Sequence, residues 1–332
     1  MDDREHRLVN DFQRAFPLCE APYAVVAKAL HVTEDWVLDT LRRLADEGIV
    51  SRVGAVFRPG SVGASTLAAM AVPPARLAAV ARVVSAHRGV NHNYEREHRF
   101  NLWFVANAAD PGELDALLAR IERETVLRVH ALPLVREYHI DLGFDLDGVS
   151  PKVHPSPSGI ARRSSLDATG RRIAAALQEG LPLSPRPYLA LAERAGFPGD
   201  AGERRVLARI RAWLDEGTLK RLGIIVRHRP LGFTANAMAV WDVPDDSVDA
   251  VGARLARVPG VSLCYRRLRS LPAWPYNLFC MIHGRERPLV DAALDAIVSE
   301  QHLGDHPHAR LYSRTAFKQR GALHFDPVLQ DG

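Results

Sequence analysis

Four residues at alternate positions between Gly89 and Phe104 could together bind an anion and transfer protons: His92, Tyr94, Arg96 and His98. On an extended strand they would share one face, because successive side chains point to opposite sides. Histidine exchanges protons near neutral pH, and arginine binds carboxylates through two parallel hydrogen bonds. We expect the intervening residues to face mostly solvent: Asn93, Glu95, Glu97 and Arg99. The next residues, 101–107, read as a buried strand that would anchor the segment.

The second half of the chain repeats this pattern with different chemistry. The corresponding alternate positions hold Leu263, Tyr265, Arg267 and Arg269. An insertion, SLPAW, then precedes the sequence PYNLF. The second half therefore keeps the tyrosine, lacks both histidines and has gained arginine. We interpret this difference as a division of labour, in which one half offers proton donors and the other offers fixed positive charge.

Similar sequences recur along the whole chain, which indicates a tandem duplication. Phe16–Leu30 matches Leu181–Ala195, and Leu44–Gly63 matches Leu214–Gly232. Copy one spans roughly residues 8–147 and copy two roughly residues 167–326. The segment between them is rich in proline, serine and glycine, which is typical of a linker.

The first part of each copy predicts a winged helix-turn-helix. In copy one, Pro22–Leu30 has helical periodicity, Thr33 is a candidate N-cap, and residues 36–47 form a further helix that Gly48 ends. We expect a helix before these two and a two-stranded wing after them. The domain boundaries that we expect are 1–63 and 167–232 for these domains, with the linker at 149–166.

The second part of each copy, residues 64–148 and 233–332, predicts a ferredoxin-like domain. In copy one the order is strand 65–72, helix 74–86, the polar stretch, strand 101–107, helix 111–124 and a strand near 128–133, which is βαββαβ. The sequence thus predicts an α+β fold. Its helix-turn-helix followed by βαββαβ resembles the architecture of Lrp/AsnC regulators in both copies.

Composition predicts a soluble, cytoplasmic protein without a metal site. The net charge is +4, and we find no apolar run of signal-peptide or membrane-spanning length. The cysteines Cys19, Cys264 and Cys280 lack C-x-x-C spacing, so we expect neither a disulfide framework nor zinc. His302, His306 and His308 are interpreted as a solvated turn.

The helix-turn-helix segments are poorly suited to DNA. Glu34 and Asp35 begin the recognition helix of copy one, and Asp200 and Glu203 lie near the start of its counterpart. Carboxylates there favour the helix dipole but repel phosphates. We therefore expect no DNA binding, although the fold alone would allow a transcription regulator.

Both polar stretches resemble the motifs of one enzyme family. HNYEREHRFNLWF is similar to the H-x-Y-x-R-x-H-x-x-N-L-W-F motif of siroheme decarboxylases. GVSLCYRRLRSLPAWPYNLFCMIHGR is similar to the motif of their partner subunit. The resemblance implies a fused pair that converts siroheme to 12,18-didecarboxysiroheme on the route to heme d1. An alternative heme pathway uses the same type of enzyme.

The resemblance also implies roles for individual residues. His92 and His98 would be general acids, because CO2 loss leaves a carbanion that must be protonated, and Tyr94 would assist them. The implied substrate-binding residues are Arg96, Tyr265, Arg266, Arg267, Arg269, Trp274 and His283, with Arg58 and Arg227 assisting from the wing. The iron belongs to siroheme, so we expect no separate cofactor.

Two other functions use the same features: a tetrapyrrole-responsive regulator of Lrp/AsnC type, and a tetrapyrrole carrier. We expect a pseudo-dimer within one chain, no membrane association, and a homodimer formed through sheet edges as a further state.

Overall fold

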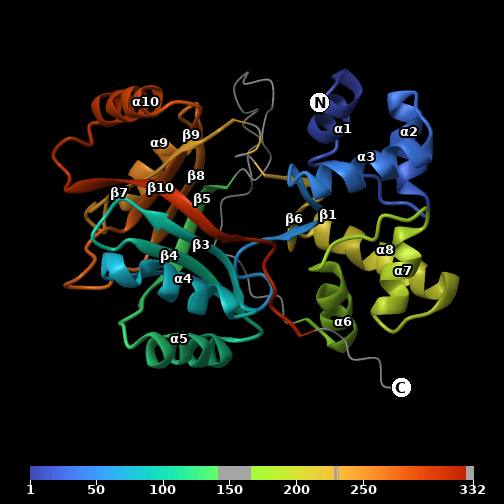
Figure 1. Ribbon diagram of the computed structural model, residues 1–332, viewed down its shortest axis with the longest axis horizontal. Coiled ribbons are helices and arrows are strands. Elements are labelled where there is room, and N and C mark those ends of the chain that lie inside the picture. Colours follow the sequence, from blue (N-terminus) through green and yellow to red (C-terminus); the bar gives the residue numbers. More distant parts are fainter. Residues whose placement is uncertain (141–165, 228–229, 231, 327–332) are drawn as a thin grey trace.

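The computed structural model describes residues 1–140, 166–227, 230 and 232–326. The helix-turn-helix parts of both copies lie together on one side of the molecule, and the sheet domains lie on the other (Figure 1). The linker expected at 149–166 falls outside the described residues, except for Leu166.

Each copy contributes three helices and one strand to the helical side. They are α1 (Asp3–Asp11), α2 (Pro22–Leu30), α3 (Glu34–Asp46) and β1 (Val50–Phe57), followed in copy two by α6 (Ala168–Leu177), α7 (Pro187–Arg194), α8 (Gly199–Asp215) and β6 (Leu219–Val226). Thr33 caps α3 as predicted, since its hydroxyl accepts a hydrogen bond from the Trp36 backbone N–H at 3.2 Å. A single apolar core joins the two copies here.

The predicted two-stranded wing in each copy is wrong. Strands β1 and β6 instead pair with each other, antiparallel, with Gly54 opposite Gly223. The pairing satisfies one edge of each strand and brings buried residues of both, such as Val53 and Ile224, into the common apolar core. The copies also exchange equivalent hydrogen bonds: the Tyr23 hydroxyl donates to the Pro182 carbonyl at 3.1 Å, and the Tyr188 hydroxyl to the Pro17 carbonyl at 3.0 Å.

The sheet parts have the predicted βαββαβ order. Copy one contributes β2 (Ala64–Met70), the 3-10 turn η1 (Pro74–Arg76), α4 (Leu77–Ala86), β3 (Val90–Arg96), β4 (Leu102–Ala108), α5 (Pro111–Thr125) and β5 (His130–Ile140). Copy two contributes β7 (Ala235–Trp241), α9 (Val248–Leu255), β8 (Val261–Arg267), β9 (Leu278–Gly284), α10 (Arg287–Glu300) and β10 (His308–Gln319). Helices α4 and α5 cover the first sheet, and α9 and α10 cover the second.

The two sheets close into one barrel of order β10-β3-β4-β2-β5-β8-β9-β7. Strand β5 begins beside β2 and continues beside β8, and β10 begins beside β7 and continues beside β3. The edges that could have paired between chains are therefore paired within this chain. An apolar cluster inside the barrel receives side chains from both copies, including Trp103, Leu132, Phe279 and Leu311.

An asparagine in each copy fastens the barrel strands to the preceding loop. The Asn101 side chain exchanges hydrogen bonds with the backbone of Val72, accepting at 2.9 Å and donating at 2.9 Å. Asn277 does the same with Val243, at 3.0 and 2.9 Å. The asparagine that begins N-L-W-F and N-L-F-C therefore has a structural role.

Candidate active site

Three of the four residues predicted to share one face, His92, Tyr94 and Arg96, line the inner face of β3. Asn93, between them, points outward, where its amide donates to the Ala81 carbonyl at 3.1 Å and to the Ser85 hydroxyl at 3.0 Å on α4. Because side chains alternate along a strand, His92, Tyr94 and Arg96 face the barrel interior. Asn93 is 0% exposed, so the expectation that it faces solvent is wrong. The outer face of β3 is covered by a helix, which the polar sequence did not reveal.

His92, Tyr94 and Arg96 form a continuous row. The His92 and Tyr94 rings are stacked with centroids 6.0 Å apart, and the Arg96 guanidinium lies 5.9 Å from the Tyr94 ring centroid. Arg96 is buried, and its Nη1 donates to the Leu311 carbonyl of copy two at 3.1 Å. Strand β10 of copy two therefore helps to position this row.

His98 lies beyond the end of β3, in the turn that leads to β4. Its Nδ1 accepts a hydrogen bond from the Phe100 backbone N–H at 3.0 Å, so the ring proton resides on Nε2. The ring contacts Trp274 edge-to-face at 5.4 Å between centroids. Burial, and to a lesser degree Arg99, lower the pKa of His98. The assumption of one extended face for all four residues holds for three of them.

Two further residues of the predicted outward set are the partly buried Glu97 and the exposed Arg99. Glu97 follows β3 and forms ion pairs with Arg287 at 2.9 Å and with Arg314 at 3.2 Å. These pairs lower the pKa of Glu97 and join the turn to α10 and β10 of copy two. The guanidinium of Arg99 lies 5.0 Å from the Phe100 ring centroid.

Copy two repeats the row with Tyr265 and Arg267 on the inner face of β8. The Arg267 guanidinium lies 4.6 Å from the Tyr265 ring centroid, and its Nη1 donates to the Leu132 carbonyl of copy one at 2.7 Å. Burial lowers the pKa of Arg267. Each arginine thus reaches the equivalent leucine of the opposite copy, which shows the pseudo-twofold relation at the level of single bonds.

Trp274 closes the barrel interior from the β8–β9 loop. It is 1% exposed and packs against aromatic rings of copy one, including Trp103 at 4.9 Å and Phe100 at 5.8 Å between centroids. The same loop meets copy one through Ser270, whose hydroxyl lies 2.9 Å from His130 Nδ1. The inserted SLPAW sequence therefore brings a copy-two tryptophan beside His98.

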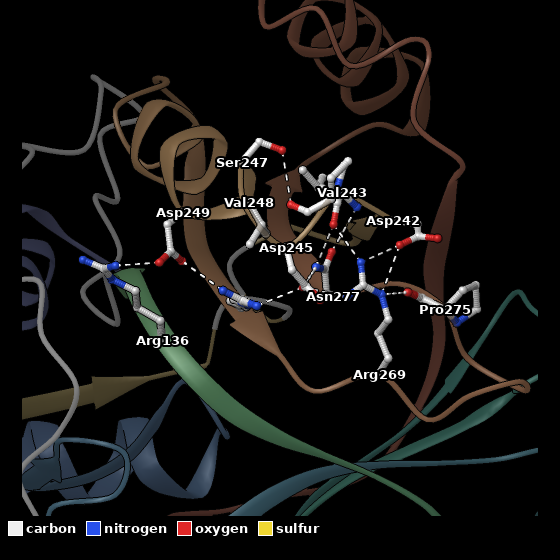
Figure 2. Close-up of polar contacts among 12 residues, drawn as sticks. Arg136, Asp242, Val243, Asp245, Ser247, Val248, Asp249, Arg269, Pro275 and Asn277 are labelled. Carbon is white, nitrogen blue, oxygen red and sulfur yellow. Dashed lines mark hydrogen bonds and ion pairs between the residues drawn. The ribbon is translucent and has the colours of Figure 1, made fainter.

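Arg269 lies in a polar network with Asp242 and Asp245 (Figure 2), and Arg266 joins this network through Asp245. Arg269 donates to Asp242 at 2.7 Å and to Asp245 at 2.8 Å, and Arg266 donates to Asp245 at 2.9 Å. Asp249 links this network to Arg136. Both arginines are already neutralised by carboxylates, so these contacts do not support their assignment to substrate. Neighbours on a strand point to opposite faces, which separates Arg266 from Arg267.

The other predicted residues are also dispersed. His283 lies on β9, and its Nδ1 is 2.8 Å from the Ser262 hydroxyl. Arg58 belongs to the helical side, where its Nε donates to the Gly217 carbonyl at 3.0 Å. Arg227 directly follows β6, and its backbone N–H donates to the Ile49 carbonyl at 2.8 Å. The printed contacts of Arg58 and Arg227 thus join them to Gly217 and Ile49 on the helical side.

Sequence reasoning missed a buried ion pair between Lys220 of β6 and Glu137 of β5. The two side chains are 7% and 6% exposed, and Glu137 lies opposite Tyr265 in the β5–β8 register. The sequence did contain a hint that Lys220 is unusual, because it is one of only four lysines in an arginine-rich chain.

Within the described ranges, no group of three or more His, Cys, Asp or Glu side chains is placed to hold a metal ion. Over the same ranges, no helix combines the length and the apolar character needed to cross a membrane.

Comparison with known proteins places this site in a family. The AsnC-like ligand binding domain model matches residues 61–139 and 230–318, and the siroheme decarboxylase NirDL-like HTH domain model matches 5–50 and 170–219. The chain is also 46% identical over 326 residues to the siroheme decarboxylase NirDL subunit of Paracoccus denitrificans, with 97% of each chain covered. This chain belongs to the siroheme decarboxylase family.

Other siroheme decarboxylases reflect the duplication. The NirD subunit of Pseudomonas aeruginosa is 49% identical over 147 residues, which is 44% of this chain and 98% of that protein. The crystal structure of a siroheme decarboxylase NirDL in co-complex with an iron-uroporphyrin III analogue matches with a TM-score of 0.67 and 29% identity, covering 98% of this chain and 94% of the other. The predicted tandem Lrp/AsnC-like fold is confirmed.

Proposed function

We propose that this siroheme decarboxylase removes CO2 from the acetate side chains at C12 and C18 of siroheme, at the inner-face row of His92, Tyr94 and Arg96. The product would be 12,18-didecarboxysiroheme, an intermediate on the route to heme d1. The observation that carries the proposal is the row itself, in which a protonatable ring, a phenol and a buried guanidinium follow one another on one strand.

Arg96 supplies the positive charge in this arrangement. Its guanidinium is buried and positioned by the Leu311 carbonyl. A buried cation strongly favours a nearby anion, because little water is present to solvate it. A substrate carboxylate beside Arg96 would therefore be held at a defined distance from His92.

His92 and His98 are the proposed proton donors. When the C–CO2 bond breaks, its electron pair remains on the acetate methylene carbon, and a proton from an imidazolium converts that carbon to a methyl group. The lowered pKa of His98 makes its ring neutral at pH 7 in the absence of substrate. A carboxylate-bearing substrate next to it would favour the protonated form, in which Nδ1 carries a proton and no longer accepts the hydrogen bond from the Phe100 N–H. Protonation of this histidine would thus be linked to substrate binding.

We propose no separate cofactor. The electron-withdrawing, iron-bearing macrocycle is the substrate, and it supplies the delocalisation that the carbanion needs. The protein would contribute binding, orientation and the proton.

The test is anaerobic incubation of the purified chain with siroheme, followed by mass spectrometry. We expect successive loss of two CO2 units. His92→Ala and His98→Ala should each lower kcat by about 100-fold or more while siroheme binding is retained. His302→Ala, at an exposed turn, is the matched control and should leave kcat unchanged. Unchanged siroheme bound by the wild-type chain would support a carrier, and salt-dependent DNA binding without turnover would support a regulator.

A further inference from the structure

The pseudo-twofold relation generates two equivalent half-sites inside the barrel. The copy-one half-site consists of His92, Tyr94 and Arg96, and the copy-two half-site consists of Leu263, Tyr265 and Arg267. The strand registers confirm the equivalence: Tyr94 lies opposite Ala316 of β10, and Tyr265 lies opposite Glu137 of β5.

The two half-sites differ in the residue that faces the tyrosine. In the copy-one half-site this residue is Ala316, which has only a methyl side chain. In the copy-two half-site it is Glu137, whose carboxylate forms the buried ion pair with Lys220. Ala316 places only a methyl group opposite Tyr94, whereas a carboxylate and an ammonium group lie in the corresponding region beside Tyr265.

The strand that each copy contributes from the helical side also differs in the size and charge of one residue. Lys220 is the second residue of β6, and the equivalent residue of β1 is Ser51, as the alignment of Arg52 with Arg221 requires. Copy one thus has Ser51 and Ala316 where copy two has Lys220 and Glu137. Both members of the ion pair are replaced by small residues in the half-site that contains the histidine.

The half-sites also differ at the position of His92. Leu263 replaces His92, so the copy-two half-site lacks the proton donor of its counterpart. To admit a carboxylate-bearing ligand there, the protein would have to separate a buried ion pair and leave each charge uncompensated, which is costly.

We infer that the chain binds and decarboxylates one siroheme at a time, at the copy-one half-site, and that the Lys220–Glu137 pair closes the copy-two half-site. This inference rests on the proposed function for the identity of the substrate. Both decarboxylations then occur at one set of residues, so the macrocycle must be repositioned between them.

The first test is the binding stoichiometry of iron-uroporphyrin III. The full chain is saturated, separated from free ligand by gel filtration, and the bound iron and the protein are quantified. We expect one ligand per chain, and two would overturn the inference. A chain that binds one ligand but releases no CO2 from siroheme would refute the proposed function and leave the single-site inference standing.

The second test exchanges residues between the half-sites. Lys220→Ser with Glu137→Ala introduces the copy-one residues and should raise the stoichiometry to two. Lys220→Met with Glu137→Gln removes the charges but keeps the side-chain volume. A stoichiometry of one for this variant would assign the closure to the volume of the two side chains, and a stoichiometry of two would assign it to the ion pair. If both double variants fold and bind one ligand, the pair does not close the half-site. His92→Leu should lower kcat by about 100-fold or more, whereas Leu263→Ala should change kcat less than twofold.

Discussion

Replacing Lys220 with methionine isolates the energetic contribution of the buried ion pair. Methionine has a similar length and carries no charge, so the main change is the loss of the cation beside Glu137. The Glu137 side chain is only 6% exposed, so water cannot solvate its carboxylate instead. Removal of one partner of a buried pair costs about 3–5 kcal/mol, because an uncompensated charge remains in the interior. We expect Lys220→Met to lower the free energy of unfolding by this amount.

The assay is equilibrium unfolding in urea, followed by tryptophan fluorescence. Glu137→Gln should cost a similar amount, because it leaves the ammonium group without its carboxylate. The double variant should be within about 1 kcal/mol of wild type, since replacing both charges is often neutral. Arg7→Met is the matched control, because the Arg7–Asp11 pair is about half exposed on both sides. It should cost less than about 0.5 kcal/mol.

A stabilising buried ion pair would be contradicted if Lys220→Met lowered the free energy of unfolding no more than Arg7→Met does. It would also be refuted if the double variant lost the sum of the two single losses, because independent effects mean that the two side chains do not interact. Either result would show that the pair is solvated in solution.

Three further predictions concern the barrel. Arg269→Ala should lower stability by about 1.5–3 kcal/mol, since Arg269 donates charged hydrogen bonds to the loop and to Asp242; a thermal melt within error of wild type would contradict this. Asn277→Ala should cost about 1–3 kcal/mol for each Val243 backbone group left unsatisfied, measured the same way. The free energy of unfolding should fall as the pH drops below 6.5. Burial lowers the pKa values of His98, His130 and His324 in the folded protein, so in this pH range the unfolded chain binds more protons than the folded one. Urea midpoints that do not change between pH 7.5 and about 5.5 would contradict this prediction.

Local patterns predicted the elements of this fold well because each depends on nearby residues. The bounds of α2 match the predicted Pro22–Leu30, and Gly48 follows α3 with a positive φ of 74°. Strand β5 was predicted near 128–133 but continues to Ile140. Its second half pairs with β8 of the other copy, and such a partner leaves no mark on local periodicity.

The same limit explains the errors at the site. The alternate spacing of His92, Tyr94 and Arg96 correctly predicted that they share one face, because the direction of a side chain depends only on the extended backbone of its own strand. It did not reveal that α4 covers Asn93, because helix packing is a tertiary contact. Arg269 was assigned to substrate from its alternate position in copy two and from the family motif, and that assignment stays a prediction. The sequence could not show that Asp242, which precedes Arg269 by 27 residues, would form an ion pair with it.

Fusion of the two copies explains how the half-sites could become different. The ion pair joins Lys220 of copy two to Glu137 of copy one, so it forms across the copies. In a symmetric dimer of one short chain, the same two residues would occur in both half-sites and would fill both. A chain in which the copies differ in sequence can carry the pair on one side and Ser51 with Ala316 on the other. The asymmetric barrel therefore requires two non-identical copies, and a fused chain ensures that each barrel contains one of each.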